Sequence, residues 1–221
     1  MAAGFLPPSH WPAKLTTRLA ALYGQSHRHY HGQAHVDALL AWLAHCQPLA
    51  ISPVRIEAAI WFHDAVYEPE RTDNEQRSAE LAEFELHALG WPDADVRSVA
   101  AMVRATRLHE APAGDADTRL FLDLDLSVLA QSPAQYAAYR DAIRAEYAWV
   151  DADRYREGRQ RVLRAFTARE HIYFTPELRE AWEPSARRNL ANELAELAAP
   201  QAPDAPVTPL APAAPDARKA S

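Results

Sequence analysis

The chain has 221 residues, of which 48% are hydrophobic, and it carries a formal net charge of −7. This length predicts one domain with an extension, and the acidic charge argues against an overall attraction to nucleic acid or to an anionic membrane. The single cysteine, Cys46, excludes an internal disulfide and a cysteine-based zinc cluster.

Targeting signals and membrane spans are missing from the sequence pattern. No apolar run approaches the ~20 residues that cross a bilayer, and the stretch MAAGFLPPSHWPAK lacks the basic start and apolar core of a secretory signal. We therefore expect a soluble, cytoplasmic monomer or homodimer that acts on a small molecule, with neither nucleic acid nor membrane as a partner.

Composition divides the chain into two parts. Glycine occurs only 6 times, and long stretches are rich in Ala, Leu, Glu and Arg, which favour helix. Near residue 199 the sequence changes to PQAPDAPVTPLAPAAPDARKAS, where prolines remove backbone donors and little apolar surface is available for burial. We predict an all-α domain over residues 1–198, a compact bundle of eight to ten helices, followed by a disordered Pro/Ala-rich tail over residues 199–221.

Proline, glycine and capping residues predict the ends of the helices in the first half. Pro53 begins the run that contains VRIEAAIWFHDAVY and ends before Pro69. Asp73 or Asn74 can cap the next helix, which stops at Gly90.

Apolar spacing predicts the helices that follow. After Trp91-Pro92, residues at i, i+3, i+4 and i+7 form one apolar face, namely Val96, Val99, Ala100 and Val103. Residues 120–126 form a strand-like stretch that fits the start of a buried helix as well. Ser132-Pro133 caps a helix whose stripe consists of Tyr136, Tyr139, Ile143, Tyr147 and Val150. Pro176 and Pro184 are each expected to open a short helix.

Histidines cluster near the N-terminus. The chain has ten, and four of them, His27, His29, His31 and His35, lie within SHRHYHGQAHVDALL. Residues four apart on a helix share a face, so His31 and His35 can point into one site. Gly32 weakens the helix between them, which places His31 just outside its start.

Two further segments put charged residues in apolar surroundings. His63-Asp64 follows AAIWF, which is apolar on every face and therefore buried, and Asp123 and Asp125 lie in another apolar run. Buried carboxylates need a charged partner or a metal. Imidazole and carboxylate ligands together suit Mn, Fe, Co, Ni, Zn or Mg, and ligands from separate segments would leave positions open for water, as in catalytic sites.

The order of these motifs resembles the HD-domain superfamily of metal-dependent phosphohydrolases. HYHGQAH, WFHDAVY, DNEQRSA, ATRLH, LDLDL and YREGR resemble a subgroup of predicted HD phosphohydrolases with unassigned substrate, over residues 15–195. The resemblance implies an all-α fold, one or two divalent metal ions, and hydrolysis of a phosphate ester, usually in a nucleotide. It implies the metal ligands His35, His63, Asp64 and Asp125. Asp123 competes with Asp125 for the last position and could instead cap the N-terminus of its helix.

Residues around these ligands have candidate roles with alternatives. His31 and His109 could bind a second ion, or contact phosphate and move protons. Glu75 could act as a general base, orient a ligand histidine, or cap the next helix together with Asn74. Arg159, with Tyr155, could bind phosphate through its guanidinium fork, or could be a surface arginine. We predict as catalytic residues Asp64, Glu75 and His109, and as substrate-binding residues His31, Asn74, Tyr155 and Arg159.

The sequence therefore predicts a metal-dependent phosphohydrolase that acts on a nucleotide-like phosphate ester through a metal-activated water. The sequence contains neither a nucleophilic Ser or Cys motif nor a glycine-rich phosphate loop, so it indicates no other catalytic mechanism. One alternative is a catalytically silent module that binds metal and nucleotide. A lesser alternative is a di-iron oxygenase of the HD type, which would need His31 and His109 as additional ligands.

Overall fold

A computed structural model describes Pro8 and residues 11–199 of the chain. Over these residues the chain forms nine α-helices and two 3-10 helices without any strand, which confirms the predicted all-α bundle. In chain order they are α1 (Ala13–Tyr23), α2 (Gln33–Cys46), η1 (Gln47–Leu49), α3 (Pro53–Phe62), α4 (Asn74–Ala88), α5 (Asp93–Ala105), α6 (Ala116–Asp125), η2 (Leu126–Ala130), α7 (Pro133–Glu146), α8 (Ala152–Thr167) and α9 (Pro176–Ala198).

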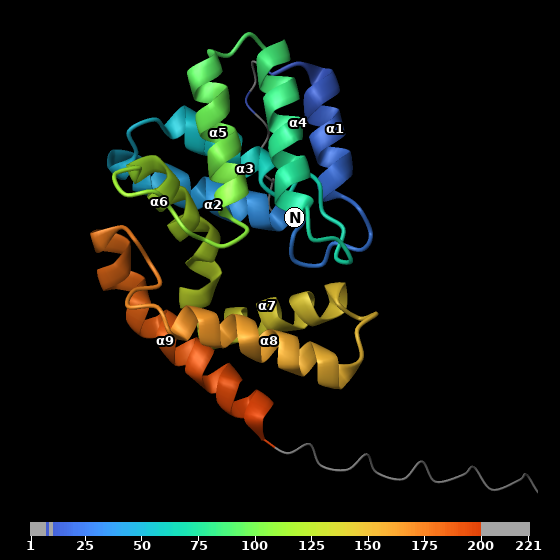
Figure 1. The fold of residues 1–221 in the computed structure, drawn as a ribbon, viewed down its shortest axis with the longest axis vertical. Helices are drawn as coiled ribbons and strands as arrows, with labels where there is room; N and C mark the ends of the chain where they lie inside the picture. The colour runs from blue at the N-terminus through green and yellow to red at the C-terminus, as the bar shows by residue number, and fades with distance from the viewer. Residues whose placement is uncertain (1–7, 9–10, 200–221) are drawn as a thin grey trace, which may run out of the picture.

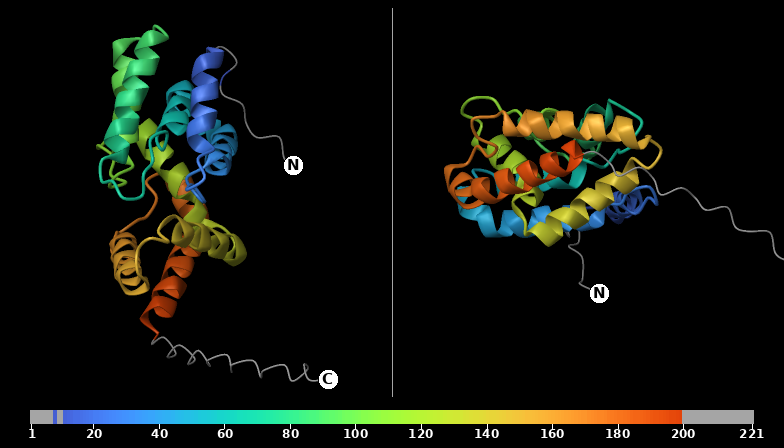
Figure 2. Two further views of the ribbon diagram at one scale, coloured as in Figure 1. Left: turned by 90° about the vertical axis from the view of Figure 1, so that its right-hand side faces the viewer. Right: turned by 90° about the horizontal axis from the view of Figure 1, so that it is seen from below.

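The helices gather around two hydrophobic clusters. The larger, which we call the first core, is built mainly from α1 to α6 around the fully buried Trp61, Phe62 and Phe121. The second core joins η2 and α7 to α9, with Tyr173 and Leu190 fully buried. Figure 1 shows α7 and α8 below the body formed by α1 to α5, and Figure 2 shows α6 and α9 running between the two parts.

Local sequence explains where several helices start and stop. Ser132 forms a capping box with Gln135 at the start of α7, which confirms the predicted cap, and Asp151 accepts a hydrogen bond from Arg154 N at the start of α8. Gly90, with φ of 76°, follows α4 in the left-handed region that glycine adopts without strain. The four apolar residues predicted to share one face of α5 are all buried.

Three sequence expectations are wrong. Tyr147 and Val150 do not belong to the helix that starts after Ser132, because α7 ends at Glu146. Residues 120–126 do not begin a buried helix or form a strand, because they lie across the last turn of α6 and the start of η2. Pro184 does not open a helix of its own, since α9 runs through it. The helix tolerates the missing N–H because it is anchored on both sides of the proline, by buried Leu178 before it and buried Leu190 after it.

The structure describes only Ala199 of the predicted tail, and the described helices can be compared with the length of a membrane span. Ala199 follows α9 as a bend, and residues 200–221 lie outside the described residues. None of the described helices is both long enough and apolar enough to cross a membrane.

Candidate metal centre

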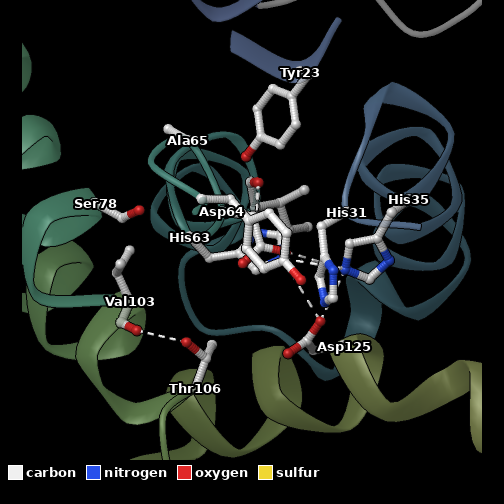
Figure 3. A network of polar contacts seen from close by, with 12 residues as sticks. Tyr23, His31, His35, His63, Asp64, Ala65, Ser78, Val103, Thr106 and Asp125 are labelled. Atoms are coloured by element: carbon white, nitrogen blue, oxygen red, sulfur yellow. Dashed lines mark hydrogen bonds and ion pairs between the residues drawn. The ribbon is translucent and has the colours of Figure 1, made fainter. Parts of the chain in front are cut away.

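Four side chains from three segments converge where α2, α3 and α6 meet (Figure 3). His35 lies in the first turn of α2, and Gly32 caps that helix, so His31 stands before its start as predicted. His63 caps the C-terminus of α3, Asp64 follows it, and Asp125 is the last residue of α6. Because the apolar residues of α3 and α6 pack into the first core, the polar groups at the ends of these helices lie in the interior.

The ligand atoms approach one another closely. His35 Nε2 lies 3.2 Å from His63 Nε2 and 3.0 Å from Asp125 Oδ1. Asp64 Oδ2 lies 3.0 Å from His63 Nε2 and 3.9 Å from His35 Nε2, and Asp125 Oδ1 lies 3.6 Å from His63 Nε2. Metal–ligand bonds of ~2.0–2.2 Å place neighbouring ligands roughly 3.0–3.5 Å apart, so the grouping of His35, His63 and Asp64 suits one shared ion. Asp125 approaches the two histidines of this group.

The hydrogen bonding of His63 supports a cation at this position. His63 Nδ1 donates to the Ile60 carbonyl at 2.9 Å, so in the neutral imidazole Nε2 carries a lone pair. That lone pair faces a carboxylate oxygen of Asp64 and the second imidazole, in a place where both histidines are buried. Such atoms repel one another unless a proton or a metal lies between them. The donor set therefore fits a divalent metal.

Ionisation at the centre follows from burial and mutual charge. Burial by itself lowers the pKa of His63, but Asp64 and Asp125 outweigh it and raise that pKa to about 9. Burial by itself raises the pKa of Asp64 and of Asp125, yet the surrounding histidines hold both well below their usual range. Both carboxylates are thus ionised, and their charges attract a cation to the centre.

His31 is held beside this centre by a carboxylate from α7. Its Nδ1 donates to Glu146 Oε2 at 2.6 Å, which leaves Nε2 free. Glu146 Oε1 also accepts the backbone N–H groups of His29, Tyr30 and His31, at 2.9, 2.7 and 2.9 Å, while the Tyr67 hydroxyl donates to Oε2 at 2.8 Å. One buried carboxylate therefore fixes both the histidine loop and the tautomer of His31.

Arg28 fixes the same loop against the turn that carries Asp64. Its guanidinium donates to the carbonyls of His31, Asp64 and Ala65 at 2.9, 2.6 and 3.1 Å. The side chain is buried between the rings of Tyr23 and Tyr67. Because three carbonyls accept from one rigid group, the positions of His31 and Asp64 are coupled.

His109 contacts the second oxygen of Asp125. Its Nε2 lies 2.9 Å from Asp125 Oδ2, and since an ionised carboxylate only accepts, Nε2 carries the proton. His109 has φ of 48°, which is uncommon for a residue with a side chain, and Arg169 donates to its carbonyl at 2.9 Å. The strained backbone is consistent with a fixed orientation of this imidazole toward Asp125.

Asp123 lies away from the ligand cluster. It is fully buried, and its two oxygens accept the backbone N–H groups of Phe174 and Thr175 at 2.8 and 2.7 Å. It does not cap the N-terminus of its own helix, because it lies near the C-terminal end of α6, and it instead secures the start of α9. Asp125 is therefore the aspartate that lies beside His35 and His63.

Other predicted site residues are engaged elsewhere. Asn74 binds the backbone of Glu68 through both amide atoms, at 3.1 and 2.9 Å. Glu75 is half-buried in the first turn of α4, where its charge acts on Tyr147. Neither residue reaches the four converging ligands, so the substrate-binding and general-base roles remain predictions.

Arg159 is buried in an ion pair rather than exposed. Its Nε and Nη2 donate to the two oxygens of Glu193 at 2.7 and 3.0 Å, and Nη1 donates to the Tyr139 hydroxyl at 3.1 Å. Tyr136 also donates to Glu193. The guanidinium predicted to bind phosphate therefore joins α7, α8 and α9. Arg159 and Tyr155 both line a cavity between α7 and α8.

Three cavities border the centre, each reached by a different histidine. One of about 540 Å³ includes His31 and lies between α7 and α8. A second of about 540 Å³ includes His35 and lies between α2 and α7. A third of about 550 Å³ includes His109 and Arg169. Each has the volume of a small-molecule site.

Glu146 and Arg28 are the residues that sequence reasoning missed. Glu146 lies three residues after Ile143, on the face that carries Tyr136 and Tyr139, and a carboxylate within such an apolar stripe is a signal of a buried partner. Arg28 stands inside the histidine cluster, where its charge offered no distinguishing pattern.

Comparison with known proteins adds no assignment. No family model, no curated protein and no solved structure matches this chain.

Proposed function

We propose that the protein is a metal-dependent hydrolase of phosphate esters, with His35, His63, Asp64 and Asp125 holding a divalent ion. The observation that carries the proposal is the convergence of two imidazole nitrogens and two carboxylate oxygens, 3.0–3.9 Å apart in the five pairs measured. The resemblance of the ordered motifs to the HD-domain superfamily supports the same chemistry. Four protein ligands leave room in a six-coordinate shell for substrate and water.

Each neighbouring side chain has a role in this proposal. The ion, when bound, supplies Lewis acidity toward a phosphate oxygen and toward the attacking water. His31 transfers a proton through Nε2, because Glu146 holds the proton on Nδ1. His109 keeps Asp125 oriented by donating to its second oxygen, which leaves the first oxygen directed at the histidines.

The test is metal analysis combined with phosphate release. The protein is purified without chelator, its metal content is measured, and a panel of nucleotides and other phosphate esters is assayed with Mn, Co, Ni, Mg and Zn. We expect bound metal and release in the wild type and loss of both in Asp64→Ala. The control is Asp153→Ala, which removes an exposed carboxylate from the first turn of α8.

Other outcomes would direct the assignment elsewhere. Folded protein without metal or release would overturn the proposal. Metal and nucleotide binding without any product would favour the silent regulatory module, and an iron chromophore that reacts with oxygen would favour the di-iron oxygenase. One ion per chain would leave His31 and His109 as supporting residues, whereas two would make them ligands.

A further inference from the structure

Gly158 occupies an unusual place in α8. It lies in the middle of a 16-residue helix, where glycine is less stable than alanine because it loses more backbone freedom on folding. Its backbone is helical, so no left-handed conformation requires glycine. A Cβ at this position would meet only Arg161 Nη2, at 4.0 Å. Neither backbone geometry nor packing of the chain itself explains the residue.

Gly158 lines the cavity of about 540 Å³ between α7 and α8, hereafter the α7–α8 cavity. The cavity extends from His31 past Tyr147 and Tyr155, and Val162 lies in its wall. A side chain at position 158 would project into space that the chain leaves unfilled. The glycine therefore keeps this volume available.

The lining of the α7–α8 cavity is aromatic and cationic. The rings of Tyr147 and Tyr155 lie 6.4 Å apart, and Arg144 lies over Tyr155 at 4.6 Å and holds it in place. Arg154, Arg161 and the Glu193-paired Arg159 line the cavity. No carboxylate is among its described lining residues, although the chain as a whole has a net charge of −7. Such a lining suits an organic anion with a planar ring.

The α7–α8 cavity approaches the proposed metal centre at His31. This histidine lines the cavity and its ring lies 6.1 Å from that of His35. A phosphate held at the centre can therefore direct its organic group between α7 and α8. The cavity beside His35 has no arginine or lysine among its described lining residues, and it is therefore less favourable for binding an anion.

We propose that the α7–α8 cavity binds the organic group of the substrate, that this group carries an aromatic ring, and that Gly158 sets the space available for it. The inference rests on the proposed function, because it takes the phosphate to lie at the metal centre. It identifies the substrate class as phosphate esters of ring-bearing alcohols, which stack on Tyr147 and Tyr155, rather than phosphates of small acyclic alcohols.

The test uses two ligands that differ only in the ring and cannot be hydrolysed. Phenylphosphonate and methylphosphonate are titrated into the full-length, metal-loaded protein by calorimetry. We expect phenylphosphonate to bind about tenfold more tightly to the wild type, since a tenfold ratio needs only modest burial of a ring. In Gly158→Leu, which places a branched side chain in the space for the ring, the ratio should fall to about one while methylphosphonate binding is retained.

Two controls and a second variant keep the result interpretable. Gly158→Ala adds the smallest side chain and should keep most of the preference, and Ala165→Leu adds the same bulk at an exposed position of α8 outside the cavity lining. If Gly158→Leu does not fold, Val162→Trp tests the same wall, because Val162 is 47% exposed and tolerates a large residue.

The outcomes separate this inference from the proposed function. Phosphate release with an unchanged ligand ratio in both filling variants would overturn the inference and leave the hydrolase intact. Loss of the ring preference in those variants without release from any ester would support the cavity assignment and overturn the hydrolase. A wild type that binds both phosphonates equally would overturn the inference directly.

Discussion

Replacing Glu146 by glutamine tests how strongly one carboxylate organises the site. In the folded protein Glu146 accepts five hydrogen bonds, three from backbone N–H groups, one from His31 and one from Tyr67. Burial by itself raises the pKa of this carboxyl, but the bonds from His31 and the backbone outweigh it and lower the pKa from 4.5 to about 2. One pKa unit corresponds to about 1.4 kcal/mol, so the charged form contributes about 3 kcal/mol to stability.

The amide introduced by Glu146→Gln would keep an acceptor oxygen for the backbone, but its NH₂ group would oppose the donors of His31 and Tyr67. We expect the free energy of unfolding in urea at pH 7 to fall by about 2–3 kcal/mol, which is most of the electrostatic contribution. The control is Glu157→Gln, since Glu157 is exposed on α8, and it should change stability by less than ~0.5 kcal/mol.

The pH dependence gives a second measurement of the same contribution. Because the folded pKa of Glu146 is depressed, its contribution is complete above the unfolded pKa of 4.5 and is lost as the pH falls toward about 2. Wild type and Glu146→Gln should therefore converge in stability across that window. Equal stability of the two proteins at pH 7, or a difference that persists at pH 2, would refute the reasoning.

Three further substitutions test separate parts of the structure. His109→Ala removes the donor to Asp125 Oδ2 and should weaken metal binding ~10–100-fold in competition with a chelator, whereas total loss of metal would make His109 a ligand. Arg159→Ala leaves Glu193 buried without its guanidinium and should lower the free energy of unfolding by ~3–5 kcal/mol, so a stability like that of the wild type would contradict the ion pair. Gly158→Ala should raise stability by about 1 kcal/mol, seen as a higher Tm, and a lower Tm would show that the position does not accept a Cβ.

Local patterns predicted most of the helices because their causes are local. Ser132-Pro133 and Gly90 act through hydrogen bonds or backbone angles within a few residues, and both mark helix ends in the structure. Pro184 misled the prediction because its effect depends on what anchors the flanking turns. Burial of Leu178 and Leu190 is a tertiary property that no window around the proline contains.

The candidate site likewise contains residues that local patterns could predict and residues that depend on distant partners. His35, His63, Asp64 and Asp125 could be proposed because each departs from an apolar environment or matches an ordered motif. The residue that holds the neighbouring His31 could not be proposed, since Glu146 lies 115 residues beyond it along the chain. Arg159 shows the same limit, because its burial depends on Glu193, which lies 34 residues away, and the alternative of a surface arginine is wrong.

Asp125 lies at the junction of α6 and η2, between the two hydrophobic cores. Leu124 packs into the first core and Leu126 into the second. A tilt of one core relative to the other would move this carboxylate with respect to His35 and His63. If the ion binds as proposed, we therefore expect ion binding and the docking of α7 to α9 to strengthen each other.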